Sequence, residues 1–436
     1  MRIERANWDG EDAASMASRL RERTAAPQSD VAADVARIIA DVRERGDEAV
    51  RDLTRRFDAT EAIPAALQVG ESEVQHALEG LDLKLRKALE VAAVNIRAVA
   101  EAELDTEETK TRLGQGQEIS LADRPVTSAG AYAPGGRAFY PSSVLMTCVP
   151  AKVAGVERVV LVSPPGPDGK LGGAVLSAAA IAGVDEIHAC GGAQAVAALA
   201  LGTESIDPVN VIAGPGNAWV TEAKRQLYGT VGIDGLAGPS ELVIVCDRSA
   251  DPLGAALDAM AQAEHGTDSP VLVLSDDAEV LERVAAEVER LAPERPSVTD
   301  ATLTLVNCPE VNRAVQLADC FAPEHLELHL AGANEALAME RTAGCVFVGP
   351  AGATAFGDYA AGSNHVLPTG GAARFSGPLG IRAFLRRTAV VIIPASAASE
   401  LAPTVASIAE AEGFPVHGES ATARAGAPET VDVQVD

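Results

Sequence analysis

The sequence lacks the features of a membrane, secreted or disulfide-rich protein. Its first residues, MRIERANWDGED, are charged from the second position and contain no apolar segment typical of a signal peptide. The longest weakly polar run, 171–184, is shorter than the ~18–20 residues that a membrane span needs. None of the six cysteines lies in a CxxC pair, which argues against a thiolate zinc site or a redox dithiol. We expect a cytoplasmic protein without membrane contact, whose thiols are buried, reduced and inert.

Basic residues are also few. The 436 residues include 35 Lys and Arg against 62 Asp and Glu, a formal net charge of −27. Nucleic-acid binding needs clustered basic side chains, so this balance argues against a nucleic-acid partner. Hydrophobic residues make up 47% of the chain, which is typical of a folded protein with a large core. The length favours about two or three domains.

An alternation of strands and helices begins near residue 130. Three apolar stretches each run into a glycine turn that a helical segment follows, and the turns are Gly130–Gly136, Gly191–Gly192 and Gly214–Gly216. A second region of this kind begins at 241. Such alternation predicts an α/β fold with two incomplete Rossmann-like, doubly wound domains, whose ligands bind at the carboxyl ends of parallel strands.

The glycine turns are candidate phosphate sites because they present backbone N–H groups and helix N-termini. The sequence contains no strict G-x-G-x-x-G. From the turns alone, nucleotide binding and plain packing of helices on strands are equally supported.

The stretch 320–330, CFAPEHLELHL, places an acid and a histidine side by side at a loop-to-strand junction. Three leucines then alternate with Glu327 and His329, the period-2 pattern of a half-buried strand. Histidine titrates near neutral pH, so Glu324 and His325 are candidates for proton transfer. His329, on the polar side of the alternation, is expected to be a surface residue.

The segment 251–265 is expected to form a helix that Asp251 caps. The large apolar positions fall on one face: Leu253, Leu257 and Met260. Gln262 and His265 are three residues apart, hence neighbours, and point away from that face. They are either a ligand pair or an exposed surface pair, and this helix alone does not decide between the two.

Further candidate ligands follow towards the C-terminus. The glycine-rich loop 349–371 carries Asp358 and His365, and structureless loops longer than ~12–15 residues are usually functional or disordered. Glu412 and His417 follow a helix near the end of the chain. Imidazoles, a carboxylate and an amide oxygen without a thiolate suit Zn²⁺ or another divalent ion. The alternatives are an ordinary glycine-rich surface loop and a solvated terminal histidine.

Eight short stretches form a specific combination. They are YAPGGRAFYPSSVLM at 132–146, GGAQAVAALA at 191–200, GPGNAWVTEAKRQ at 214–226, AGPSE at 237–241, AQAEH at 261–265, APEHLEL at 322–328, GDYAAGSNHVLPT at 357–369 and EGFPVH at 412–417. In this combination and order, the sequence resembles the histidinol dehydrogenase family.

The resemblance implies a chemistry and a set of residues. The reaction would be the oxidation of L-histidinol through L-histidinal to L-histidine, the last two steps of histidine biosynthesis, with one Zn²⁺ per subunit and two NAD⁺ consumed per substrate. Glu324 and His325 would be the acid–base pair. The implied zinc ligands are Gln262, His265, Asp358 and His417. These four ligands and His325 would also contact the substrate, and the further implied substrate positions are Ser240, His365 and Glu412. The implied NAD contacts are Tyr132, Gln194 and Asn217.

The resemblance also implies an intertwined homodimer, in which a C-terminal tail reaches into the partner's active site. We expect four parts. They are an N-terminal arm at 1–30, a first α/β domain at 31–129 and 238–380 with the metal and catalytic residues, an NAD-binding α/β domain at 130–237, and a tail domain at 381–436.

On the residues alone, other functions stay open. One is a zinc-dependent hydrolase with Glu324 as its base, and another is a non-catalytic metal- or nucleotide-binding protein. A third is a thiol mechanism of the aldehyde-dehydrogenase type, which needs a cysteine near Glu324. The cysteines weighed for that role are Cys148, Cys190 and Cys320, and their apolar neighbours favour inert thiols.

Overall fold

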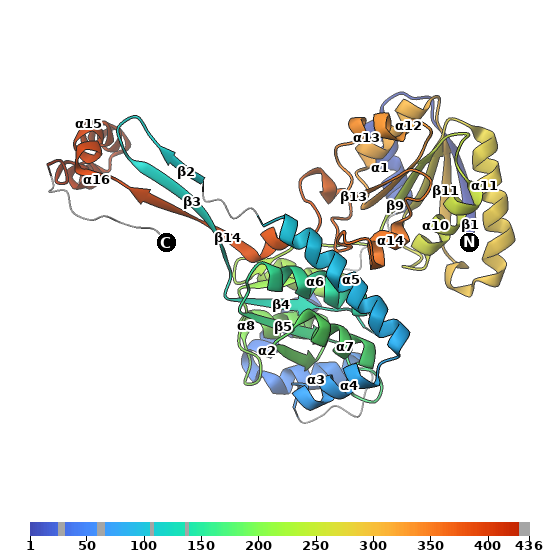
Figure 1. Cartoon of the computed structure of the whole chain (residues 1–436), viewed down its shortest axis with the longest axis horizontal. Helices are drawn as coiled ribbons and strands as arrows, with labels where there is room; N and C mark the ends of the chain where they lie inside the picture. Colours follow the sequence, from blue (N-terminus) through green and yellow to red (C-terminus); the bar gives the residue numbers. More distant parts are fainter. Residues whose placement is uncertain (25–30, 59–65, 105–108, 136–138, 427–436) are drawn as a thin grey trace. The chain divides into compact units, whose positions relative to one another are not determined.

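The structure, a computed structural model, describes residues 1–24, 31–58, 66–104, 109–135 and 139–426 (Figure 1). It divides into two compact units. The first consists of Met1–Glu103 and Val126–Phe384, and the second of Leu104–Pro125 and Leu385–Asp436. The end of the predicted arm (25–30), Gly136 of the first glycine turn and residues 427–436 of the predicted tail lie outside the described residues.

The first unit contains a six-stranded sheet in which every pair of neighbours is parallel. In spatial order its strands are β1 (Arg2–Asn7), β11 (Thr302–Asn307), β10 (Val271–Ser275), β9 (Leu242–Cys246), β12 (His325–His329) and β13 (Cys345–Val348). From β9 the chain passes through β10 to β11 on one side, and it then crosses to β12 and β13 on the other side of β9. This order confirms the predicted doubly wound fold.

Helices cover both faces of this sheet, which is why its strands are apolar on both sides. Leu242 and Ile244 of β9 pack with α10 and α11, whereas Val243 and Val245 face α1 and α12. The helices of this half are α1 (Ala13–Thr24), α10 (Pro252–Ala263), α11 (Ala278–Leu291), α12 (Val311–Phe321), α13 (Ala333–Met339) and α14 (Thr354–Tyr359). The short 3₁₀ helices are η1 (Ala292–Glu294), η2 (Pro296–Val298), η3 (Ala372–Arg374) and η4 (Ile381–Phe384).

A second parallel sheet in the same unit has five strands. In spatial order they are β6 (Glu186–Ala189), β5 (Arg158–Ser163), β4 (Ser128–Tyr132), β7 (Val211–Ala213) and β8 (Gly232–Ile233). Its helices are α2 (Ala32–Arg45), α3 (Asp47–Phe57), α4 (Glu71–Gly80), α5 (Leu83–Ala102), α6 (Pro141–Val153), α7 (Gly173–Ala182), α8 (Gly192–Leu201) and α9 (Ala218–Leu227). A helix follows each of the three glycine turns, which confirms the predicted strand–turn–helix units.

The packing around the two sheets differs from the predicted domain division. β1, inside the predicted N-terminal arm, is an edge strand of the six-stranded sheet, with Arg2 opposite Thr302. α2 and α3, which lie in the predicted metal-binding domain, pack on the five-stranded sheet. The cause is the apolar stripe of α2, in which Val35 and Val42 are buried in one core with α8 and α9.

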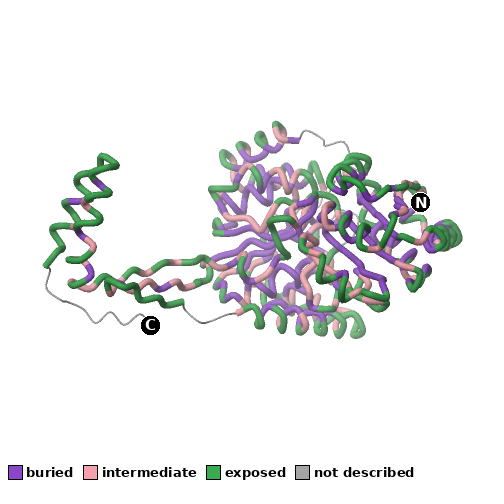
Figure 2. Tube along the Cα trace, turned by 90° about the horizontal axis from the view of Figure 1, so that it is seen from above, coloured by how far each residue is buried: buried purple, intermediate pink, exposed green. Residues whose placement is uncertain are grey.

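The second unit is small. Its antiparallel sheet has the order β14 (Leu385–Ile392), β3 (Glu118–Pro125) and β2 (Thr109–Arg112), and its two helices, α15 (Ala395–Glu412) and α16 (Pro415–Thr422), pack on each other. Much of this unit is exposed, as the green trace in Figure 2 shows. Across the described ranges of the whole chain, none of the helices is both long and apolar enough to cross a membrane.

Candidate active site

The predicted catalytic pair lies at the amino-terminal ends of the strands of the six-stranded sheet. Glu324 directly precedes β12, and His325 is its first residue. α10 runs back from the carboxyl end of β9, so its last turn, with Gln262, reaches the same end of the sheet. The carboxyl-end rule, which the sequence pattern predicted, therefore describes the glycine turns of the five-stranded sheet and not the position of this pair.

Hydrogen bonds from neighbouring strands fix both members of the pair. One oxygen of Glu324, Oε2, accepts from the Ser240 hydroxyl at 2.6 Å and from the Glu241 backbone N–H at 2.8 Å. The Glu241 carbonyl lies 3.2 Å from His325 Nδ1 and accepts the His325 backbone N–H at 3.1 Å. A proton on Nδ1 would satisfy that contact and leave Nε2 of His325 as the base.

The environment moves the pKa values of this pair towards and beyond neutrality. Burial raises the pKa of Glu324 to about 7, although His325 and the Ser240 hydroxyl partly oppose the rise. Burial alone would lower the pKa of His325, but the carboxylates of Glu324 and Asp358 outweigh it and raise the pKa to about 9. In the metal-free protein Nε2 therefore carries a proton at neutral pH, and it can act as a base only after it has lost that proton. Glu324 can therefore exchange a proton near neutral pH, as an acid–base residue must.

A stability measurement can test the raised pKa of Glu324. Its folded-state pKa of about 7 exceeds the ordinary 4.5, so the folded state binds more protons between these values and stability falls as pH rises through them. Glu324→Gln removes this titration. We therefore expect the unfolding free energy of the metal-free variant, relative to that of the wild type, to rise by roughly 3 kcal/mol from about pH 4.5 to pH 8, at about 1.4 kcal/mol per pKa unit.

Urea unfolding at both ends of that pH range gives the comparison. Glu73→Gln, at an exposed position on α4, is the matched control and should follow the wild-type pH dependence. Parallel stability curves for Glu324→Gln and wild type would show that Glu324 is not held neutral by burial.

Gln262 is buried, with 2% of its surface exposed, so the predicted face of α10 is wrong. Leu253 and Leu257 are each 40% exposed, and the face towards the sheet is formed mainly by alanines. Small side chains let the helix backbone approach the sheet closely, which large leucines would prevent. The prediction that Asp251 caps this helix is confirmed, because its side chain accepts from the N–H groups of Leu253 and Gly254.

The side-chain amide of Gln262 has a hydrogen-bonded nitrogen and an oxygen without a hydrogen-bond partner among the described residues. Its Nε2 donates to the Ser240 hydroxyl at 2.8 Å, and the Ser240 hydroxyl in turn donates to Glu324. Its Oε1 is buried and has no hydrogen-bond partner among the described residues. A buried amide oxygen without a donor costs about 1–3 kcal/mol, and a bound cation would satisfy it.

Asp358 brings three imidazoles together. It lies on α14, inside the stretch expected to be a structureless loop, and its Oδ1 is 3.5 Å from Nε2 of His325. The charges of His325, His365 and His265 all act on its carboxylate, whose pKa is lowered despite burial. His265 itself is exposed. The described part of the first unit thus gathers Gln262, His265 and Asp358 around the catalytic pair.

Ser240 and His365 occupy structural positions in this network. Ser240 links Gln262 to Glu324, as described above. His365 has Nδ1 at 2.8 Å from the Asp358 carbonyl and Nε2 at 3.1 Å from the Ser143 hydroxyl, so protein atoms engage both ring nitrogens. Their predicted contacts with substrate stay predictions.

His329 is not the surface residue that the alternating pattern predicted. It is 7% exposed, and its Nε2 lies 3.3 Å from a carboxylate oxygen of Glu327, which is fully buried. Asp258, one turn before Gln262 on α10, completes this cluster. Sequence reasoning missed Asp258, although its neighbours Ala255 and Ala259 mark the small-residue face of the helix.

The predicted NAD residues surround the carboxyl ends of β4, β6 and β7. Tyr132 ends β4, and its hydroxyl accepts the N–H of Gly192 at 3.1 Å. Gln194 is buried on α8, and its Nε2 has no hydrogen-bond partner in the described part of the chain. The Asn217 side chain caps α9. Gly214, at φ +118°, must be glycine because a Cβ would lie 2.2 Å from the Tyr132 carbonyl oxygen.

A cleft lies between the two sheets of the first unit. Its volume is about 500 Å³, which is in the size range of small-molecule sites. His265 and Glu264 line one side, and Pro134, Gly135 and Tyr140, which follow β4, line the other. The glycine turn after β4 and His265, one of the metal-ligand candidates, therefore face the same space.

Glu412 and His417 belong to the second unit. Both are exposed, and the ring of His417 lies 5.6 Å from that of Phe414, measured between centroids. The site in the first unit therefore contains three of the four expected metal ligands, and the part of His417 stays a prediction.

The cysteines do not favour a thiol mechanism. All six are free, and four are buried. Burial raises the pKa of Cys148, Cys190 and Cys320, the cysteines considered for this role. Cys345 is nearer to the catalytic pair, because its N–H donates to the Glu324 carbonyl, but burial raises its pKa as well. A protonated thiol is a poor nucleophile.

Comparison with known proteins identifies the family. A sequence profile described as histidinol dehydrogenase matches residues 21–425. The chain belongs to the histidinol dehydrogenase family. It is 44% identical to the histidinol dehydrogenase of Zymomonas mobilis over 416 residues, which cover 93% of this chain and 96% of the relative. It is 46% identical to that of Pseudomonas aeruginosa over 399 residues, which cover 89% of each chain.

A solved histidinol dehydrogenase has the same fold. The crystal structure from Elizabethkingia anophelis superposes with a TM-score of 0.89 at 29% identity and covers 97% of this chain and 98% of its own. The chain is therefore an oxidoreductase of the histidinol dehydrogenase family, and this family membership sets aside the hydrolase and the non-catalytic binding protein.

Proposed function

We propose that this protein oxidises L-histidinol through L-histidinal to L-histidine, with Zn²⁺ and two NAD⁺. The observation that most supports this proposal is the unpartnered oxygen of Gln262 beside the Glu324–His325 pair. It combines a vacant ligand atom with an acid–base pair in one network of hydrogen bonds.

The residues present fit a zinc ion. Gln262 offers its free oxygen, Asp358 a carboxylate and His265 an imidazole, an N/O set that zinc accepts. His417 is the proposed fourth ligand. Ser240 orients the amide of Gln262, as outer-shell groups do for metal ligands. A bound zinc ion would supply Lewis acidity and a template that positions the substrate.

The catalytic pair divides the proton transfers. His325 Nε2 takes the proton from the substrate hydroxyl in the first oxidation, while NAD⁺ accepts the hydride. Glu324 then assists the addition of water to the aldehyde, because its pKa of about 7 allows it to take and return a proton. His325 deprotonates the resulting gem-diol as the second NAD⁺ accepts hydride. Ser240, His365 and Glu412 are proposed to contact the substrate.

The cleft between the two sheets is the proposed place for the nicotinamide cofactor. The turns after β4, β6 and β7 provide backbone N–H groups and the N-termini of α6, α8 and α9, which favour phosphate. The free Nε2 of Gln194 is a candidate donor. Tyr132 and Asn217 are proposed to shape the site, because they hold the turns that carry it.

The second unit is proposed to complete the site of a partner subunit. Large apolar side chains of this unit are 52–68% exposed, and they are Val391, Ile393, Ile408, Phe414 and Val416. Apolar side chains gathered on a small unit indicate a contact surface with another protein. His417 lies beside Phe414 and Val416 of this set, so docking on a second copy would carry it into an active site.

Product stoichiometry tests the proposed reaction. With L-histidinol, Zn²⁺ and excess NAD⁺, we expect two NADH and one L-histidine per histidinol consumed, because the same pair serves both oxidations. Absorbance of NADH and chromatography of the product give the ratio. One NADH with accumulating aldehyde would reduce the protein to an alcohol dehydrogenase, and no NADH would overturn the proposal.

A further inference from the structure

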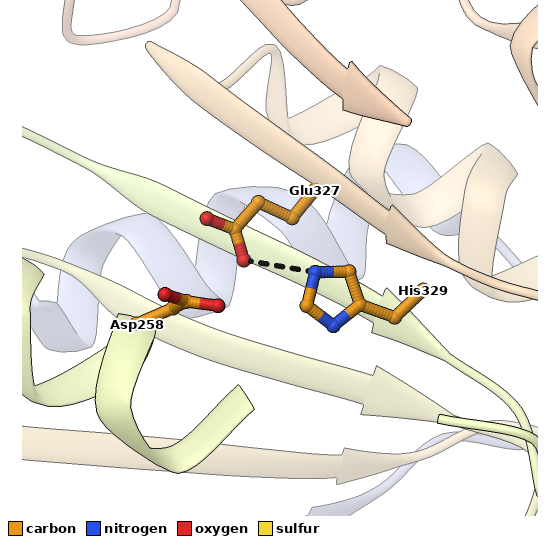
Figure 3. A group of neighbouring side chains, drawn as sticks. All are labelled: Asp258, Glu327 and His329. Atoms are coloured by element: carbon orange, nitrogen blue, oxygen red, sulfur yellow. Dashed lines mark ion pairs between the residues drawn. The ribbon is translucent and has the colours of Figure 1, made fainter. Parts of the chain in front are cut away.

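The polar cluster behind the catalytic pair has no assigned role. It consists of Asp258 on α10 and of Glu327 and His329 on β12, shown in Figure 3. Their ligand atoms lie within 4.8 Å of one another. Glu327 is fully buried, and this calls for an explanation because a buried carboxylate is costly unless its oxygens are satisfied.

Glu327 anchors the helix that carries Asp358. Its Oε1 accepts both the backbone N–H of Thr354 at 2.7 Å and the Thr354 hydroxyl at 2.8 Å. Thr354 is the first residue of α14, and no side chain caps this helix at Ala353. A carboxylate at this position satisfies an N–H without an intrahelical partner and interacts favourably with the helix dipole.

Two side-chain contacts, one at each end of α14, join this helix to β12. Thr354 meets Glu327, and four residues later Asp358 meets His325. Four residues rise about 6 Å along a helix, and two residues span about 6.6 Å along a strand. The two spacings match, and residues i and i+4 of a helix share a face, as do i and i+2 of a strand. Fixing the first contact therefore sets the register of the second.

We propose that Glu327 is a positioning residue, which sets the place of the Asp358 carboxylate relative to His325 and the proposed metal by holding the first turn of α14. This role rests on the proposed function of the site and adds a residue that does not itself touch substrate or metal. Gly357 supports the same placement, because its Cα lies against the Phe347 ring, where a Cβ would come within 2.5 Å.

A shared proton accounts for the rest of the cluster. Burial and Glu327 raise the pKa of Asp258 to about 7, so Asp258 can donate a hydrogen bond to Glu327. His329 Nε2 lies 3.3 Å from Glu327 Oε2 and 3.4 Å from the Gly352 carbonyl, which suits an N–H donor better than a metal ligand. With Oε1 occupied by Thr354 and His329 Nε2 beside Oε2, both oxygens of Glu327 have a polar neighbour without a bound cation.

Three variants test the proposal on the zinc-loaded protein. Glu327→Leu removes the acceptor, and Glu327→Gln keeps an amide oxygen that can accept from Thr354. Leu328→Ala, at the next residue of β12 and on its opposite, fully buried face, is the control for general destabilisation. The readouts are kcat and KM for histidinol, Zn²⁺ affinity by chelator competition, amide hydrogen exchange of 354–358, and the thermal midpoint.

We expect Glu327→Leu to lower kcat or Zn²⁺ affinity by about 10–100-fold, the usual effect of losing an outer-shell partner. Exchange at 354–358 should accelerate in this variant, and Glu327→Gln should stay within about threefold of wild type. Leu328→Ala should lower the thermal midpoint but keep kcat and Zn²⁺ affinity. If Glu327→Leu does not fold, Thr354→Val removes the hydroxyl hydrogen bond to Glu327 and keeps the backbone one, so it should change the same readouts by a smaller factor.

Three results would overturn the proposal. The first is wild-type hydrogen exchange at 354–358 in Glu327→Leu, and the second is a Glu327→Gln protein that is as impaired as Glu327→Leu. The third is a wild-type protein that binds two metal ions per chain and a Glu327→Gln protein that binds only one. The exchange measurement does not depend on activity. Failure of the proposed function would instead appear in the wild type, as an absence of Zn²⁺ binding and NADH formation.

Discussion

Replacing His325 by asparagine should lower kcat by about 10²–10⁴-fold, the usual contribution of a general base, while KM for histidinol changes only a few-fold. The proposed role of Nε2 is to take a proton in the transition state of both oxidations. The asparagine amide can still donate to the Glu241 carbonyl, which now lies 3.2 Å from Nδ1. The start of β12 should therefore keep its geometry, and the loss should be chemical.

Steady-state rates of NADH formation, measured with each variant fully loaded with zinc, check this expectation. His76→Asn is the matched control, because His76 is exposed on α4 and takes no part in the site. It should retain wild-type kcat. If His325→Asn turned over at the wild-type rate, His325 could not be the base, and Glu324 would be the remaining candidate for both proton transfers.

The parts of this site that sequence could predict are those with a local physical signature. Adjacent Glu324 and His325 follow a proline at a strand entry, and the structure brings them into one network with Ser240. The cap at Asp251 needs only residues within one turn. The glycine turn at Gly214 is visible in the local sequence, although the backbone that requires glycine there is that of the distant Tyr132.

The parts that sequence could not predict depend on distant partners. β12 alternates leucine with polar residues, the pattern of a half-buried strand, yet all five of its residues are buried because α10 and α14 cover the polar side. Glu327 is tolerable there because Thr354 donates two hydrogen bonds to its Oε1 and His329 Nε2 lies 3.3 Å from its Oε2. Likewise, β1 was expected to belong to an N-terminal arm because its pairing partner, β11, lies about 300 residues away in the sequence.

The position of the site at the amino-terminal ends of the strands has a similar cause. Rules for doubly wound folds refer to loops after strands, and they hold for the glycine turns around Tyr132. Gln262, however, comes from the end of a returning helix, and Asp358 comes from a short helix placed by long-range contacts. Neither position follows from the order of strands and helices alone.

Two inactive variants should restore activity when they are mixed. His325→Ala removes the base in the first unit, and His417→Ala removes the proposed zinc ligand in the second. If the second unit reaches into the partner's site, each mixed dimer contains one site with both wild-type residues and one with neither. At equal amounts and with random exchange of subunits, about one quarter of wild-type activity is the upper bound for a closed dimer.

The physical basis of this expectation is the surface around His417. Phe414 and Val416 are 57% and 68% exposed, although they flank a residue expected to bind metal. In a dimer these side chains would be buried, and His417 would be held against a second chain. The mixture should be denatured and refolded together, so that subunits exchange, and then assayed for NADH formation beside each variant refolded alone. Activity of the mixture equal to the sum of the separate variants would place His417 and His325 in the same chain's site, or remove His417 from the metal.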